Sequence, residues 1–90
     1  MSQKSFKFTV KGKVQRVGFR FHTAHTALKL DLVGYARNQA DGSVEVLACG
    51  EEEKVNELAE WLKIGPQLAR VDSIEKVETQ WQELSDFKMY

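Results

Sequence analysis

Apolar and polar residues alternate near the start of the chain, where lysine and threonine separate Phe6, Phe8 and Val10. A period of two places successive side chains on opposite faces, so this segment is predicted to be a half-buried strand. From Phe21 the period lengthens to that of a helix, and the apolar face is formed by Phe21, Ala24, Ala27 and Leu28. We therefore expect a strand, a loop and a helix that ends before Gly34.

The middle of the chain has the pattern of a hairpin followed by a second helix. Two short segments, 35–38 and 44–47, read as strands and flank Asp41-Gly42, a dipeptide typical of hairpin turns. From about Glu51 the apolar residues recur at the i, i+3, i+4 and i+7 spacing of a core-facing helix, at Val55, Leu58, Ala59 and Leu62. Gly65-Pro66 is expected to end this helix, because glycine suits a C-cap and proline breaks helices.

The last part of the chain is extended in character from Val71 to Trp81, and Phe87 with Met89 predict a final short strand. The order strand, helix, strand, strand, helix, strand predicts an α+β fold, a ferredoxin-like (βαββαβ) sandwich with two helices on one face of an antiparallel sheet. A length of 90 residues favours a single domain over residues 1–90.

Composition narrows the class of protein. Thirteen basic and thirteen acidic residues give zero formal charge, so no basic excess points to a nucleic-acid partner. No apolar run reaches the roughly 18 residues of a membrane span, and the N-terminal residues lack the apolar core of a signal peptide. Cys49 is the only cysteine, which rules out an internal disulfide and suits the reducing cytoplasm. His22 and His25 are the only histidines, so we expect no metal site.

The loop before the first helix, GKVQRVGFR at residues 12–20, concentrates cationic and small residues. The first N–H groups of a helix lack partners and attract anions. Gly18 lets the backbone approach a ligand closely, and the planar guanidinium of Arg20 matches phosphate oxygens. Together these features predict a phosphate-binding loop, although the spacing does not fit a Walker-type P-loop.

This chain resembles the acylphosphatase family. The resemblance rests on GKVQRVGFR, on GYARNQADGSVEV at residues 34–46 and on GPQLARVDSI at residues 65–74, and it extends from about Phe6 to Phe87. It implies hydrolysis of small acyl phosphates to a carboxylate and inorganic phosphate, without a metal or cofactor. We also expect a cytoplasmic enzyme that is a monomer and has no nucleic-acid or membrane partner.

The resemblance assigns roles to individual residues. Arg20 corresponds to the family's phosphate-binding arginine, and Asn38 to its water-positioning asparagine. The phosphate oxygens would be wrapped by the backbone N–H groups of Gln15, Arg16, Val17, Gly18, Phe19 and Arg20. Among these, Gln15 and Val17 are expected to be structural, the first shaping the loop and the second filling the core.

Position 16 departs from the family pattern, because the family usually has glycine where this chain has Arg16. If the backbone there is left-handed, a residue other than glycine costs on the order of 1–2 kcal/mol. If it is not, the arginine adds a second cation beside the phosphate.

Two interpretations from other classes stay open at this point. RNA-recognition modules share the strand and helix order, and VGFRF superficially echoes their aromatic signature, but there the aromatic residues lie on central strands and stack bases. A regulatory domain that binds a small anion without catalysis would also keep the loop. The presence of both Arg20 and Asn38 favours the enzyme.

Overall fold

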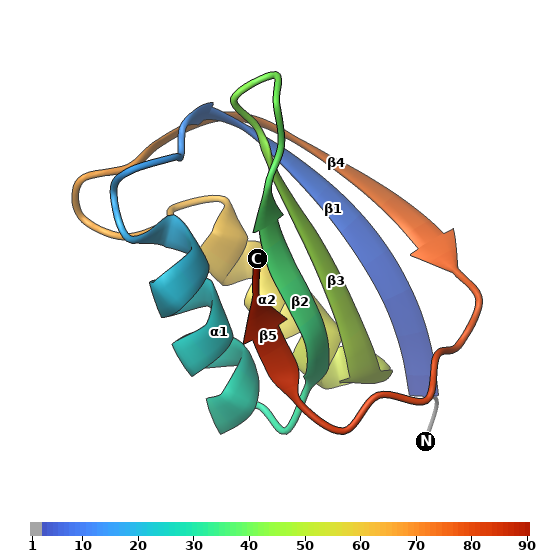
Figure 1. Ribbon diagram of the computed structural model, residues 1–90. Helices are drawn as coiled ribbons and strands as arrows, with labels where there is room; N and C mark the ends of the chain where they lie inside the picture. Colours follow the sequence, from blue (N-terminus) through green and yellow to red (C-terminus); the bar gives the residue numbers. More distant parts are fainter. Residues whose placement is uncertain (1–2) are drawn as a thin grey trace.

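A computed structural model describes residues 3–90, and within them the elements follow the order β, α, β, β, α, β, β (Figure 1). Their bounds are β1 Gln3–Lys13, α1 Phe19–Lys29, β2 Val33–Asn38, β3 Val44–Glu51, α2 Glu52–Leu62, β4 Arg70–Thr79 and β5 Phe87–Met89. The predicted sequence of elements is confirmed. The strand predicted to reach Trp81 ends earlier, at Thr79, and both strands of the hairpin are longer than predicted.

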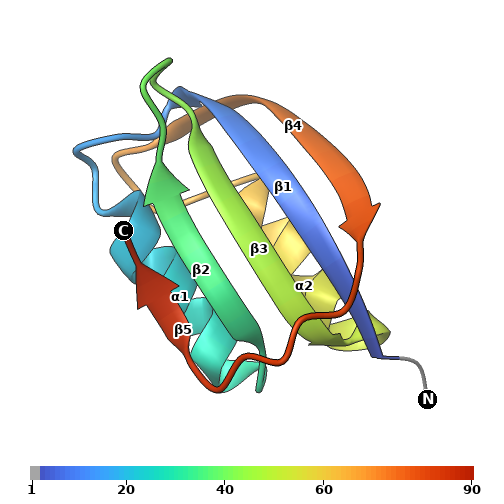
Figure 2. The ribbon, with the colours of Figure 1, turned by 45° about the vertical axis from the view of Figure 1, so that its right-hand side comes forward.

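The strands form one sheet in the order β4-β1-β3-β2-β5. The pairs β1–β3, β1–β4 and β2–β3 are antiparallel, whereas β2–β5 is parallel. The ferredoxin-like α+β architecture is therefore confirmed, but the sheet is mixed and not wholly antiparallel. After β4 the chain crosses the end of the sheet to the opposite edge, so β5 enters from the end where β2 begins and runs in the same direction (Figure 2).

Both helices cover the same face of the sheet, and the core lies between them and the strands (Figures 1 and 2). The alternating side chains of β1 are buried as predicted, with Phe6 7% exposed and both Phe8 and Val10 fully buried. The predicted face of α2 is confirmed at Val55, Leu58 and Leu62, which are also fully buried. Ala59 is partly buried against the same core.

The predicted face of α1 is only half right. Ala24 and Ala27 are buried, but Phe21 and Leu28 are 59% and 51% exposed. The helix begins two residues earlier than predicted, at Phe19, whose ring is 1% exposed and packs on Trp61 with centroids 5.8 Å apart. Phe19 takes the place in the core that the periodicity assigned to Phe21, because two phenylalanines two positions apart cannot lie on one side of a helix.

The hairpin between β2 and β3 turns at the predicted Asp41-Gly42, where Gly42 has a φ of 93°. Two main-chain hydrogen bonds of Gln39 close the turn. Its N–H donates to the Ser43 carbonyl at 2.9 Å, and its carbonyl accepts from the N–H of Gly42 at 3.1 Å. Over residues 3–90, neither helix is long and apolar enough to cross a membrane.

Candidate active site

The loop between β1 and α1 ends at Gly18, the N-cap residue of the helix. Gly18 has φ 77° and ψ 15°, a left-handed conformation that glycine adopts without steric cost. A Cβ added there would lie 3.3 Å from Cδ2 of His22. The first turn of α1 holds no acidic residue, so no carboxylate competes for the positive end of the helix. This end of the helix is therefore open to an anion.

Arg16 also has a left-handed backbone, with φ 63°. Its side chain is exposed. The family's usual glycine at this position thus corresponds to a conformation that costs an arginine on the order of 1–2 kcal/mol. The loop therefore holds Arg16 in a conformation that glycine adopts without steric cost, and it carries an additional cation at its surface.

Gln15 fastens the loop to the turn of the β2–β3 hairpin. Its side-chain Nε2 donates to the main-chain oxygens of Gln39 at 2.8 Å and of Ser43 at 2.9 Å. Ser43 is held in turn by Asp41, whose Oδ1 accepts from the Ser43 hydroxyl at 2.6 Å. Because Asn38 directly precedes this turn, Gln15 fixes the distance between the loop and Asn38.

Arg20 and Asn38 meet at one main-chain atom of Tyr90. Nη1 of Arg20 donates to the Tyr90 main-chain oxygen at 2.6 Å, and the N–H of Asn38 donates to the same oxygen at 3.3 Å. Tyr90 is itself aligned on β2, since its N–H donates to the carbonyl of Ala36 at 2.8 Å. The two residues assigned to catalysis thus share a fixed neighbour, although they come from a helix and a strand.

A hollow of about 210 Å³ brings the predicted site residues together. It is lined by Val14, Arg16, Gly18, Phe19, Arg20, Phe21, Asn38 and Met89. Two residues of the predicted phosphate-binding loop do not line it: Gln15 bonds to the hairpin, and Val17 packs against the core. The sequence reasoning missed Phe21, which it placed in the core, and Met89, for which no local pattern gives a signal.

The side chain of Asn38 has an unusual environment. Its Oδ1 is buried and accepts no hydrogen bond from any group in residues 3–90. A buried acceptor left unpaired costs about 1–3 kcal/mol, so such an atom calls for a donor in the working site. Because Oδ1 has almost no surface open to solvent, a donor can reach it only after the Asn38 side chain or its surroundings shift.

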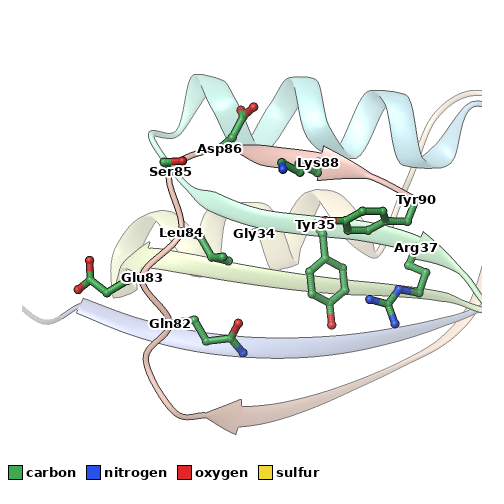
Figure 3. A pocket seen from close by; sticks show the side chains of 10 residues that line it. All are labelled: Gly34, Tyr35, Arg37, Gln82, Glu83, Leu84, Ser85, Asp86, Lys88 and Tyr90. Carbon is green, nitrogen blue, oxygen red and sulfur yellow. The ribbon is translucent and has the colours of Figure 1, made fainter.

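A larger hollow, of about 330 Å³, lies on the face of the sheet away from the helices (Figure 3). There the guanidinium of Arg37 lies 4.8 Å from the ring centre of Tyr35 and 5.5 Å from that of Tyr90. Burial, and then the hydrogen bond of 2.5 Å that the Tyr35 hydroxyl donates to Glu45, raise the pKa of Tyr35 to about 12. None of the predicted site residues lines this hollow.

The histidines lie on the exposed side of α1, in contact with the ring of Phe21. The ring of His22 meets it edge-on at 5.3 Å and that of His25 is stacked at 6.5 Å. Across residues 3–90, no three side chains of histidine, cysteine, aspartate or glutamate are grouped so that they could hold a metal ion. The lining of the 210 Å³ hollow offers the guanidinium groups of Arg16 and Arg20, the amide of Asn38, backbone N–H groups and an apolar rim.

Comparison with known proteins gives a consistent result over almost the whole chain. Residues 6–89 match the family model described as Acylphosphatase. The chain is 77% identical over 90 residues to an acylphosphatase of Aliivibrio fischeri, covering all of both chains. Among solved structures it is similar to an acylphosphatase from Coxiella burnetii, with a TM-score of 0.94 and 38% identity over 98% of this chain and 93% of that one. It is also similar to the Bacillus subtilis acylphosphatase, with a TM-score of 0.92 and 32% identity over 99% of each chain.

Proposed function

The chain belongs to the acylphosphatase family and is an acylphosphatase, and from this premise we propose that Arg20, Asn38 and the loop of residues 15–20 perform the hydrolysis. The reaction splits the bond between the carboxyl group and the phosphate of a small acyl phosphate, giving a carboxylate and inorganic phosphate. The observation that carries the assignment is the single hollow that joins Arg20 at the start of α1 to Asn38 at the end of β2.

Arg20 and the helix N-terminus bind the phosphate in this proposal. The guanidinium offers a planar pair of donors, and the free N–H groups of the loop and first turn surround the remaining oxygens. The charge of a transferring phosphoryl group is spread over its equatorial oxygens, so fixed donors around them lower the barrier. The hydrogen bond from Arg20 to Tyr90 keeps the guanidinium in place before substrate arrives.

Asn38 positions the attacking water. An amide is no proton acceptor of useful strength, but the amide group of Asn38 can hold the water by hydrogen bonding, in line with the bond that breaks. The water oxygen forms the new bond to phosphorus, and the carboxylate departs with the electron pair of the broken bond. A carboxylate has low proton affinity and needs no general acid. The proton released by the water passes to an oxygen of the substrate phosphate.

We further propose that the enzyme works without a metal or cofactor, as a single domain over residues 1–90 and as a monomer in the cytoplasm. Its only partners are then the acyl phosphate and inorganic phosphate, with no nucleic acid or membrane. Cys49 is 1% exposed, which is compatible with a reducing compartment. RNA binding is not supported, because the phenylalanines of the central strand β1 are buried and cannot stack on bases.

The experiment is a measurement of phosphate release from acetyl phosphate by the purified protein, with and without a chelator of divalent cations. We expect hydrolysis well above the uncatalysed rate and no effect of the chelator. Phosphate release at the uncatalysed rate by well-folded protein would contradict the proposed residues and chemistry. Activity that the chelator abolishes and a divalent ion restores would contradict the metal-free mechanism.

A further inference from the structure

We propose that Glu45 is a positioning residue for the reaction: from the opposite face of the sheet, it fixes the hairpin turn to which the phosphate-binding loop is fastened. The inference rests on the proposed function, because it takes the loop of residues 15–20 to bind the phosphate. Glu45 lies in β3 between Val44 and Val46, which are fully buried. Since neighbouring side chains of a strand point to opposite faces, the Glu45 side chain lies on the face away from the helices. It does not line the 210 Å³ hollow, so it can act on catalysis only through other residues.

The carboxylate of Glu45 accepts hydrogen bonds from two neutral donors. Its Oε2 accepts from the Tyr35 hydroxyl at 2.5 Å, and its Oε1 accepts from Nε2 of Gln39 at 2.9 Å. Arg37 lies opposite Glu45 in the pairing of β2 with β3, but its guanidinium lies over two tyrosine rings and, in the part of the chain that the structure describes, forms no ion pair. An ionised carboxylate accepts at both oxygens and presents no donor. Glu45 therefore suits the two donors that converge on it.

The side chain of Gln39 transmits this constraint to the hairpin turn. While its Nε2 donates to Glu45, its Oε1 lies 2.9 Å from the hydroxyl of Ser43, which also donates to Oδ1 of Asp41 at 2.6 Å. The main-chain N–H of Gln39 donates to the Ser43 carbonyl at 2.9 Å. Ser43 is 2% exposed and Gln39 is half-buried, so water competes little for these contacts. The side chains thus add to the main chain in fixing Gln39 relative to Ser43.

Gln15 connects this turn to the phosphate-binding loop. Its Nε2 donates to the main-chain oxygen of Gln39 at 2.8 Å and to that of Ser43 at 2.9 Å. The two protons of an amide nitrogen point in fixed directions, so both bonds form only when the two carbonyls have the right separation. Gln39 also follows Asn38 directly in the chain. The hydrogen bonds from Glu45 through Gln39 to Gln15 therefore set the placement of the loop relative to Asn38.

The test compares Glu45→Gln with the wild type. The variant keeps the shape of the side chain but replaces one carboxylate oxygen by an NH2 group, so one of the two converging donors meets another donor. We expect kcat for acetyl phosphate to fall by about three- to tenfold, the effect of one hydrogen bond. The inhibition constant of inorganic phosphate should change by less than about twofold, because the loop keeps its own conformation and only its placement relative to Asn38 changes.

Glu75→Gln is the matched control, because it makes the same substitution in the same row of the sheet. Glu45 of β3 and Glu75 of β4 both pair with Thr9 of β1. Glu75 is exposed and lies on an edge strand, two strands away from Glu45. Its variant should leave both kcat and the inhibition constant of phosphate unchanged.

An exchange of the two side chains tests the contact between Glu45 and Gln39 directly. Gln39→Glu alone places two carboxylates against each other, so kcat should fall at least as much as in Glu45→Gln. In the double variant Glu45→Gln/Gln39→Glu, the amide at position 45 donates to the carboxylate at position 39, and its oxygen still accepts from Tyr35. The kcat of the double variant should therefore return to within about twofold of the wild-type value.

The side-chain NH2 signals of Gln15 in ¹H–¹⁵N spectra follow the same hydrogen bonds without an activity assay. They should shift in each single variant and return in the double variant, although Glu45 does not contact Gln15. Unchanged kcat in Glu45→Gln, a fall in kcat matched by the phosphate inhibition constant, or a double variant no faster than the single variants would overturn the positioning role. Wild-type protein that does not hydrolyse acetyl phosphate would contradict the proposed function instead. The Gln15 signals would then decide the structural link, which shifts in the single variants support and unshifted signals overturn.

Discussion

The tasks proposed for Arg20 and Asn38 at the substrate phosphate differ, so their alanine variants should differ as well. Arg20→Ala removes a cation that contacts substrate and transition state alike, so we expect weaker binding of inorganic phosphate and a loss of about 10³-fold or more in kcat/KM. Asn38→Ala removes the acceptor that holds the water, so kcat should fall by about 10²-fold while the inhibition constant of phosphate changes little. Steady-state kinetics with inorganic phosphate as inhibitor measure both quantities.

Arg37→Ala provides a control for this comparison. Arg37 is the neighbour of Asn38 in β2, but its guanidinium lies on the other face of the sheet, over the rings of Tyr35 and Tyr90. Removing it should change neither phosphate inhibition nor kcat by more than a few-fold. The assigned roles would be wrong if Asn38→Ala weakened phosphate binding as much as Arg20→Ala, or if both variants lost only a few-fold in rate.

Arg16 should tune the enzyme without being required for turnover. Its φ of 63° means that Arg16→Gly relieves left-handed strain, and we expect the free energy of unfolding to rise by about 0.5–1 kcal/mol after the greater entropy of unfolded glycine is subtracted. Turnover at saturating substrate should persist. At low salt, KM should be modestly higher in the variant than in the wild type. The difference should shrink as salt screens the charge that Arg16 carries in the wild type. Urea titrations and kinetics at several ionic strengths test these statements.

Asp31→Gly is the control that separates the relief of backbone strain in Arg16→Gly from the loss of the positive charge of Arg16. Asp31 also has a left-handed backbone, with φ 58°, and it does not line the hollow that holds Arg20 and Asn38. Its glycine variant should gain stability, though less than Arg16→Gly, because aspartate tolerates this conformation better than arginine does. It should leave KM and its salt dependence unchanged. A loss of turnover in Arg16→Gly that approaches the loss in Arg20→Ala would make Arg16 a catalytic partner.

At the scale of elements, the loop and the β2–β3 hairpin are joined by the side chain of Gln15. Gln15→Ala removes both donated hydrogen bonds and leaves two carbonyls without this donor, so the free energy of unfolding should fall by about 1–2 kcal/mol. Because the loop is proposed to bind the phosphate and the hairpin follows Asn38, kcat should also fall, by about tenfold or more. Gln67→Ala, at an exposed position outside the site, should change neither quantity. Unaltered kcat in Gln15→Ala would show that the loop holds its position without this contact.

The elements themselves could be predicted, but their relative placement only in part. The apolar residues of β1 and of α2 recur with a clear period in the sequence, because each element buries only one face against the core. The face of α1 could not be read correctly, since Phe19 and Phe21 compete for the core and only tertiary packing decides between them. The parallel direction of β5 depends on where residues 80–86 cross the sheet, and no local pattern specifies that path. For the same reason Met89 could not be placed at the site, whereas Arg20 and Asn38 lie in segments that resemble the family.

At the scale of the whole molecule, the stability of the fold should depend on the ionisation of Tyr35. Its pKa is raised from 10.0 to about 12, chiefly by burial and then by its hydrogen bond to Glu45, so the folded state favours the neutral phenol. This contribution is fully present below pH 10 and is lost as the pH rises from about 10 to 12. Tyr35→Phe has no phenol to ionise, so the stability of the wild type relative to the variant should be constant below pH 10 and fall as the pH rises from about 10 to 12.

Urea unfolding of the two proteins from pH 7 to pH 12 measures this difference directly. Lysine and the other titrating groups are common to both chains, so their contributions cancel in the comparison. A gap between wild type and Tyr35→Phe that stayed constant over the whole range would show that the phenol ionises equally well in the folded and unfolded states.

The hydrogen bond from Arg20 to the main chain of Tyr90 joins residues 70 positions apart. During refolding, the guanidinium can be held only after the segment near Tyr90 has docked on β2, which requires the chain to have crossed the sheet. Recovery of enzymatic turnover should then follow that docking step, whereas the fluorescence of Trp61 in a Trp81→Phe variant reports the packing of α2 against Phe19. The same reasoning applies during synthesis: the guanidinium of Arg20 lacks this hydrogen bond until the segment near Tyr90 has left the ribosome and docked on β2.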